Sequence, residues 1–110
     1  MLGIAADTKI FLYGEAVDMR NGFEGLQAIV EQLICEDPTS GAYFVFLNRY
    51  HNRIKVLYWD LDGFALWSKR LEKGKFLCDH QGKVSISRRD FFLMLEGITP
   101  KRINRRYSLS

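Results

Sequence analysis

The clearest pattern along the chain is helical and covers residues 22–35. Apolar side chains recur there at spacings of three and four positions, which places them on one face of a helix of about fourteen residues. These positions are Phe23, Leu26, Ile29, Val30, Leu33 and Ile34. Asn21, with Glu24 three positions later, has the pattern of a helix N-cap. Asp37-Pro38 predicts the end of the helix, because the residue before proline avoids helical angles.

The middle of the chain has the pattern of consecutive β-strands. Residues 43–47 are apolar on both faces, and two further strand-like runs, 53–59 and 64–70, follow. These two runs flank Asp60-Leu-Asp-Gly63, and Asp-Gly between such runs is a strong signal for a hairpin. We therefore expect an antiparallel meander of these three strands.

Shorter patterns precede and follow the meander. Residues 9–13 form a β-type run before the helix, and turn residues occupy 79–83. Ser87 with Asp90 repeats the capping pattern and predicts a short helix that Gly97 ends.

Length and composition place these elements in one domain. The chain has 110 residues, of which 47% are hydrophobic and 26% charged, the balance of an ordinary globular protein. The expected fold class is α+β: a small antiparallel β meander with an N-terminal amphipathic helix and a short C-terminal helix, over residues 1–98. Residues 99–110 follow as a basic C-terminal tail with Lys101, Arg102, Arg105 and Arg106.

The apolar stretches and the two cysteines indicate the compartment. No apolar run is long enough to span a membrane, and the N-terminus lacks the features of a secretion signal. Cys35 and Cys78 belong to no pairing motif. A reduced, cytoplasmic setting without membrane contact is therefore expected.

The formal charge of +3 is unevenly distributed. Residues 1–47 carry two basic residues against seven acidic ones, a balance of −5, whereas residues 48–110 carry fourteen against six, a balance of +8. A basic region of this size favours an anionic partner, and nucleic acid is the commonest one. The alternatives are a solvated surface and a surface for an acidic protein.

The alternation of the hairpin brings part of this charge together. Arg53, Lys55 and Arg70 share one face, at the end away from the turn, in either of two registers. If the loop is 60–63, Arg53 lies opposite Arg70; if it is the tight pair 62–63, Glu72 lies opposite Arg53 instead. Like charges directly opposite each other are destabilising, so either Glu72 or a phosphate is expected to neutralise them.

Two neighbouring segments, 48–52 and 73–75, are expected at this same end. They add cations, His51 and an aromatic residue, Tyr50, and such a combination suits a nucleic-acid backbone. The candidate nucleic-acid-binding residues are Arg49, Arg53, Lys55, Arg70, Lys73 and Lys75. The alternative is a solvated sheet edge that lysine and arginine protect from aggregation.

Other candidate chemistry has less support. Asp60 and Asp62 could ligate a divalent cation, as a nuclease requires, but Asp-x-Asp-Gly is more simply turn chemistry. Cys78 and His80 have no matching pair for zinc. We therefore expect no catalytic residue, no metal and no cofactor.

One further motif is assigned a structural role. Arg20 is a lone cation in the acidic half of the chain, and we expect it to pair with Asp18, Asp60 or Asp62. The residues of this structural set are Asp18, Arg20, Asn21, Asp60, Asp62 and Gly63.

A series of short motifs runs in order between Lys9 and Ile98. The series is Asp18-Met-Arg-Asn-Gly22, Gly25-Leu26, Asp37-Pro-x-Ser-Gly41, Phe44-Val-Phe46, Asn48-Arg49, Lys55, Trp59-Asp60, Asp62-Gly-Phe64, Lys69-Arg-Leu-Glu-x-Gly74 and Phe76. It resembles the TnpB-type accessory protein, the second open reading frame product, of insertion-sequence-66 (IS66) bacterial transposons. This family is distinct from the RNA-guided nuclease that shares the TnpB name. His51, Asn52 and Ser68 depart from its pattern, and the first two weaken the phosphate surface.

The resemblance implies an accessory role beside a larger transposase, and it carries no catalytic set. We therefore expect a non-catalytic accessory protein for transposition that binds DNA, at transposon ends or target, through the basic hairpin edge. The alternative is a protein-interaction module that binds the co-encoded transposase without contacting DNA. A metal-dependent nuclease built on Asp60 and Asp62 is a third candidate, and self-association is left open.

Overall fold

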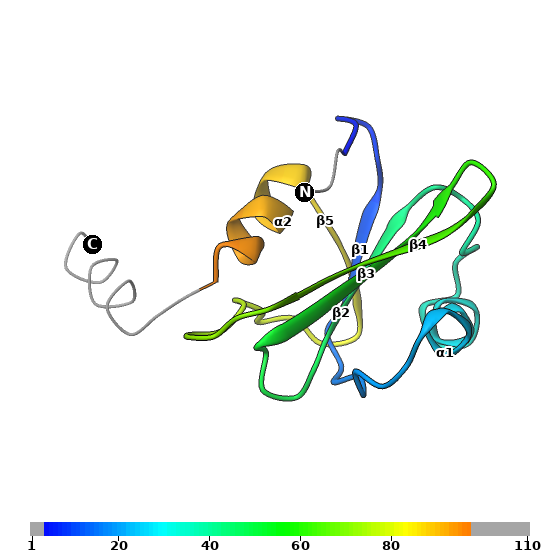
Figure 1. Ribbon diagram of the computed structural model, residues 1–110. Coiled ribbons are helices and arrows are strands. Elements are labelled where there is room, and N and C mark those ends of the chain that lie inside the picture. The colour runs from blue at the N-terminus through cyan, green and yellow to red at the C-terminus, as the bar shows by residue number, and fades with distance from the viewer. Residues whose placement is uncertain (1–3, 98–110) are drawn as a thin grey trace.

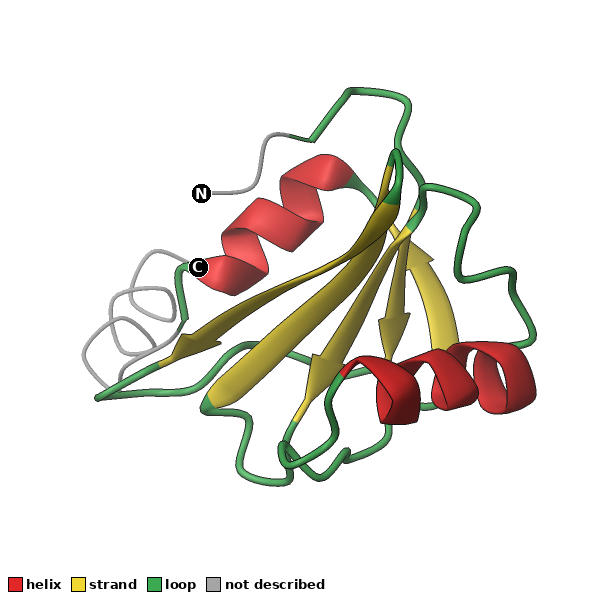
Figure 2. Ribbon diagram, turned by 45° about the vertical axis from the view of Figure 1, so that its right-hand side comes forward, coloured by secondary structure: helices red, strands yellow, loops and turns green. Residues whose placement is uncertain are grey.

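The computed structural model describes residues 4–97, which form one five-stranded sheet with a helix on each face (Figures 1 and 2). The strands are β1 (Ile10–Tyr13), β2 (Tyr43–Leu47), β3 (Arg53–Asp60), β4 (Gly63–Arg70) and β5 (Lys83–Ile86). The helical segments are α1 (Phe23–Ile29), the π-helical turn η1 (Val30–Ile34) that continues it, and α2 (Arg88–Leu95). The α+β fold class is confirmed, and the predicted basic tail lies outside the described residues.

The sheet has the order β4-β3-β2-β1-β5 and is mixed. Strands β2, β3 and β4 form the predicted antiparallel meander. The sheet extends beyond this meander, because β1 pairs with β2 in parallel, with Ile10 opposite Tyr43. Parallel neighbours need a long crossover connection, and the segment that carries α1 and η1 supplies it.

Strand β5 forms the edge of the sheet beyond β1. We did not predict this strand; the predicted turn at 79–83 overlaps only its first residue, Lys83. It is antiparallel to β1, with Ile10 opposite Ile86. The strand has only four residues and alternates between exposed and half-buried positions. Its pairing depends on a partner far away in the sequence, so the local pattern gave little sign of it.

Each face of the sheet has its own apolar core. The face under α2 is formed by Ile10, Leu12, Val45, Ile54 and Val56, packed against Phe91, Met94 and Leu95. The face under α1 and η1 is formed by Phe44, Phe46 and Leu57, packed against Leu26, Val30 and Ile34. Strand β2 contributes to both clusters and is buried at all five positions, which explains its uninterrupted apolar sequence.

The first helix differs from its prediction in its N-cap and in its last turn. The N-cap is Gly22 rather than Asn21, and no side chain caps it. The Nδ2 of Asn21 instead donates to the backbone oxygen of Asp18 (2.9 Å), and its Oδ1 occupies the space that a Cβ on Gly25 would need. The π turn η1 also rotates the later side chains relative to an α-helix, so Leu33, expected on the apolar stripe, is 60% exposed.

The second helix begins as predicted. The Oγ of Ser87 accepts a hydrogen bond from the backbone N–H of Asp90 (3.0 Å). At the other end, Gly97 has a positive φ of 73°. The Nζ of Lys69 donates to the backbone oxygen of Leu95 (3.1 Å), so a side chain from β4 satisfies a carbonyl in the last turn of α2.

Candidate nucleic-acid interface

The chain segments that carry the candidate cations meet at one end of the sheet. Because β1 and β2 are parallel, the segments that follow both strands emerge at the same end, and the backbone N–H of Val17 donates to the oxygen of Leu47 (2.9 Å). Strand β3 begins at this end and β4 finishes there (Figure 1). The expected convergence of 48–52 with the end of β4 is confirmed by the hydrogen bond from Leu71 N to Asn52 O (2.8 Å).

The register of the β3–β4 hairpin is the wider of the two that we considered. Asp60 pairs with Gly63, so Leu61 and Asp62 form the loop, and Arg53 lies directly opposite Arg70. The Nη2 of Arg70 lies 3.2 Å from Glu72 Oε1, and both side chains are exposed. This ion pair neutralises Arg70 alone and is weak in water, so the charge of Arg53 remains unbalanced.

The loop between β2 and β3 is ordered by hydrogen bonds to one side chain. The Oδ1 of Asn48 accepts from the backbone N–H groups of Asn52 and Arg53, each at 3.0 Å, and its Nδ2 donates to Asn52 Oδ1 (2.6 Å). His51 has a positive φ of 56°, and its oxygen accepts from Phe76 N (2.7 Å). The loop therefore presents the residues at its tip on a fixed backbone.

Five of the six candidate cations are exposed, namely Arg49, Arg53, Arg70, Lys73 and Lys75, and we call them the basic end. Lys55 is different. Its Nζ donates to the backbone oxygens of Met19 (2.7 Å) and Asn21 (2.8 Å), and the residue is half-buried. Lys55 therefore holds the segment before α1 against β3, and its ammonium group is committed to that contact.

Arg20 pairs with Asp18, one of the three carboxylates that we expected. Its Nη2 donates to Asp18 Oδ2 (2.6 Å), and its Nε and backbone N–H also donate to this carboxylate. These hydrogen bonds, first those of the side chain and then that of the backbone, lower the pKa of Asp18 from 3.8 to about 2. Because the folded-state pKa is depressed, the ionised pair stabilises the fold above pH 3.8, and this contribution disappears as the pH falls through about 2.

An open groove of about 400 Å³ separates the segment after β1 from the loop after β2. Its lining residues are Ala16, Val17, Asp18, Met19, Arg20, Asn48, Arg49, Tyr50 and Arg53. We did not predict this groove from the sequence, because Asp18 and Arg20 lie in a different segment of the chain from the basic end. Only the parallel pairing of β1 with β2 places the two motifs side by side.

The carboxylates at the hairpin tip lie at the opposite end of β3 and β4 from the basic end. Asp60 and Asp62 are exposed, and the backbone N–H of Asp62 donates to the oxygen of Asp60 (2.6 Å). A two-metal site also needs a third carboxylate, and both Asp18 and Glu72 lie at the basic end instead. Within residues 4–97, no three His, Cys, Asp or Glu side chains are grouped so that they could hold a metal ion.

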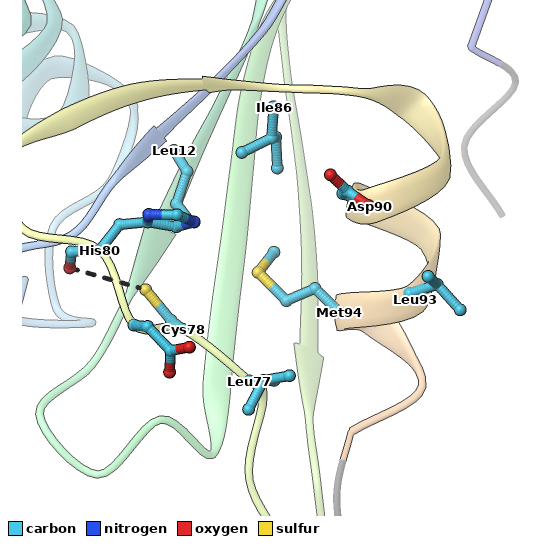
Figure 3. A pocket seen from close by; sticks show the side chains of 9 residues that line it. Leu12, Leu77, Cys78, His80, Ile86, Asp90, Leu93 and Met94 are labelled. Carbon is cyan, nitrogen blue, oxygen red and sulfur yellow. Dashed lines mark hydrogen bonds between the residues drawn. The ribbon is translucent and has the colours of Figure 1, made fainter. Parts of the chain in front are cut away.

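A smaller pocket of about 210 Å³ lies between α2 and the sheet and contains Cys78 and His80 (Figure 3). The Cys78 thiol donates to the backbone oxygen of His80 rather than to its ring (3.9 Å). Most of the other lining side chains are apolar, including Leu12, Ile86 and Met94. The pocket therefore presents a thiol and an imidazole without the pairing that nucleophilic chemistry needs.

Residues 8–105 match the family described as IS66 Orf2 like protein. The chain belongs to this family. Two proteins of Sinorhizobium fredii are similar to the chain: Uncharacterized protein y4jC is 33% identical over 108 residues (96% of this chain, 92% of the relative), and Uncharacterized protein y4hO is 31% identical over 100 residues (89% and 87%). No solved structure matches the chain.

The family resemblance of the sequence motifs is thereby confirmed, and membership in the IS66 Orf2 family associates the chain with an accessory role in transposition. Two of the motifs that carried the resemblance, Asp18-Met-Arg-Asn-Gly22 and Asn48-Arg49, line the same groove or adjoin it. No helix in the described part of the chain is long and apolar enough to cross a membrane.

Proposed function

We propose that this protein is a non-catalytic accessory factor for transposition of an IS66-type element, and that it binds DNA at the element ends or the target. The observation that supports this proposal is the basic end, where five exposed cations from three segments of the chain converge. The only acidic partner found for them among residues 4–97 is Glu72, on Arg70. Lys101, Arg102, Arg105 and Arg106 add further positive charge to the chain.

The physical basis of the proposal is counterion release. Each cation that neutralises a DNA phosphate releases a condensed counterion, and affinity therefore falls as salt is added. Such contacts position a protein on DNA without reading its sequence. The proposed surface has this sequence-independent character, because it consists of arginine and lysine side chains on loops and strand ends.

The expected result of a salt titration follows from these contacts. Log affinity for a duplex should fall linearly with log salt, at a slope of about −0.9 per phosphate contacted. Arg53→Ala should flatten this slope by about one unit and weaken binding to all sequences alike. Fluorescence anisotropy with labelled duplexes of two unrelated sequences, at four or more salt concentrations, measures both quantities.

Asp60→Asn is the matched control for this experiment, because Asp60 lies on the same strand at the far end of the hairpin. It should leave the affinity and the slope unchanged, and binding should not require a divalent metal. Affinity that is independent of salt and of the Arg53 change would rule out DNA binding by the basic end.

A second candidate function, binding of the co-encoded transposase, is favoured by the outer edge of β4. This strand of eight residues ends the sheet order and has no further strand beside it in residues 4–97. Leu71 N bonds to Asn52 O, and hydrogen-bonded positions alternate along an antiparallel pair. The N–H and C=O groups of Leu66 and Ser68 therefore point away from β3, where an added strand of a partner could pair with them.

Ser68→Pro tests this second candidate. Proline removes one outward N–H at an exposed edge position, where strands tolerate it, so the fold should persist while edge pairing is lost. Capture of the co-encoded transposase should weaken about tenfold or more, as expected for a lost hydrogen bond and a steric block, and DNA affinity should not change. Ser68→Ala keeps the N–H and should bind the transposase normally; a normal result for Ser68→Pro as well would exclude the edge of β4.

A further inference from the structure

Tyr50 is exposed to solvent, whereas the other tyrosines of residues 4–97 are buried or half-buried. Its side chain is 67% exposed at the tip of the loop between β2 and β3. Tyr43 and Tyr58 stack on each other, and Tyr13 contacts Phe46, whereas Tyr50 takes part in no aromatic pair within the described chain. The fold therefore holds a large flat ring in water, beside the groove that it lines.

Cations surround this ring on both walls of the groove. Arg49 and Arg53 lie on its own side, and Arg20, with 91% of its side chain exposed, lies on the other. The carboxylate of Asp18 is neutralised by Arg20, whose guanidinium it orients. The groove thus combines an exposed aromatic face with a net positive charge, the pair of features that proteins use to bind unpaired nucleotides.

The size of the groove narrows the choice of ligand. Its volume of about 400 Å³ is within the range of pockets that hold small organic molecules, so one nucleotide can enter it. A base inside a duplex hides both faces in the stack and presents only its edges. The ring of Tyr50 can therefore stack on a base only where the strand is unpaired.

We infer that the groove binds an unpaired nucleotide of single-stranded DNA, with the base stacked on Tyr50 and the adjacent phosphates held by Arg49, Arg53 and Arg20. This inference rests on the proposed DNA binding and makes it more specific. It assigns the protein a preference for unpaired over paired DNA. It also gives Arg20 a contact with ligand in addition to its pairing with Asp18.

The test compares one strand in two states at equal salt. Anisotropy is measured for a labelled twelve-nucleotide oligothymidylate, alone and annealed to oligoadenylate, with the full chain. The single strand should bind more tightly than the duplex. Tyr50→Ala should weaken single-strand binding about 5- to 100-fold, the equivalent of one lost base stack, and change duplex binding less than about twofold.

Three controls define the outcome. Tyr50→Trp keeps an aromatic face and should retain the preference, and an abasic strand of equal length should bind wild type as weakly as the intact strand binds Tyr50→Ala. Leu61→Ala, at a site that is 93% exposed at the far end of the hairpin, should change nothing. Melting temperatures confirm that each variant is folded, which the exposure of Tyr50 leads us to expect.

The results separate this inference from the proposed function. Salt-dependent binding to the duplex, with no preference for the single strand and no effect of Tyr50→Ala, would overturn the inference and leave the proposed function standing. Absence of binding to either form would overturn both. Tighter binding to a matching oligouridylate than to oligothymidylate would overturn the assignment to DNA.

Discussion

Lys55→Met is expected to lower the free energy of unfolding by about 2 kcal/mol, although Lys55 looks from the sequence like one more surface cation. Its ammonium group donates to the backbone oxygens of Met19 and Asn21. Methionine keeps the length of the stem but removes both donors, and a half-buried carbonyl that loses a charged donor costs roughly 1–3 kcal/mol. Urea unfolding followed by tryptophan fluorescence measures the change.

Lys75→Met is the matched control, since it makes the same chemical change at an exposed site of the basic end. It should leave stability within about 0.5 kcal/mol of wild type and flatten the salt slope of DNA binding by about one unit. Lys55→Met should lower the stability and leave the salt slope of DNA binding unchanged. A flatter slope with unchanged stability in Lys55→Met would show that Lys55 contacts phosphate, as the sequence pattern had suggested.

Gly14→Ala is expected to be still more damaging, at about 3 kcal/mol. A Cβ at this position would collide with the backbone oxygen of His80 and lie 3.0 Å from the Cα of Gln81. Gly14 N also donates to Gly82 O (2.7 Å), so the two segments cannot separate without losing this hydrogen bond. Because the obstacle is backbone rather than a flexible side chain, relaxation requires moving the entry to β5.

Thermal unfolding of Gly14→Ala and Gly63→Ala makes the comparison. A Cβ on Gly63 meets nothing within 4 Å, and its φ is not positive, so Gly63→Ala should stay within about 0.5 kcal/mol of wild type. Equal stabilities of the two variants would contradict the close approach between the ends of β1 and the segment before β5.

Local sequence signals were sufficient for the central meander and for α2. The apolar run of β2, the two flanking runs and the Asp-Gly turn specified three strands whose observed bounds differ little from the prediction. The capping pattern at Ser87 likewise located the start of α2. These features depend on side chains that are only a few positions apart, so a short stretch of sequence is enough to predict them.

Features that depend on distant partners escaped prediction. The parallel pairing of β1 with β2 and the addition of β5 at the edge are set by contacts between segments far apart in the sequence. Asn21 was predicted as the helix N-cap because its spacing to Glu24 fits a capping box. Its side-chain amide instead donates to the backbone oxygen of Asp18, and Gly22 is the N-cap. The apolar spacing of residues 30–34 fits an α-helix, so it did not indicate the π turn η1.

In the candidate site, too, local features could be predicted and features that depend on distant partners could not. The alternation within one hairpin was enough to place Arg53, Lys55 and Arg70 on one face, because period two fixes faces without tertiary information. It left two registers open, and the structure selects the one in which Arg53 lies opposite Arg70. The alternation could not reveal that Lys55 is held by carbonyls from another segment, or that Arg20 and Tyr50 line one groove. Both facts follow from how β1 and β2 lie in the sheet.

The position of β1 between β2 and β5 also determines when this protein can fold during its synthesis. Ile10, near the beginning of the chain, pairs on one side with Tyr43 and on the other with Ile86. A ribosome must therefore release nearly the whole domain before the sheet can close, and non-local pairing of this kind folds slowly. Until α2 has been made, the apolar residues of β2 on the face under α2, such as Val45, stay uncovered. We therefore expect the nascent chain to bind chaperones and to aggregate if translation stops early.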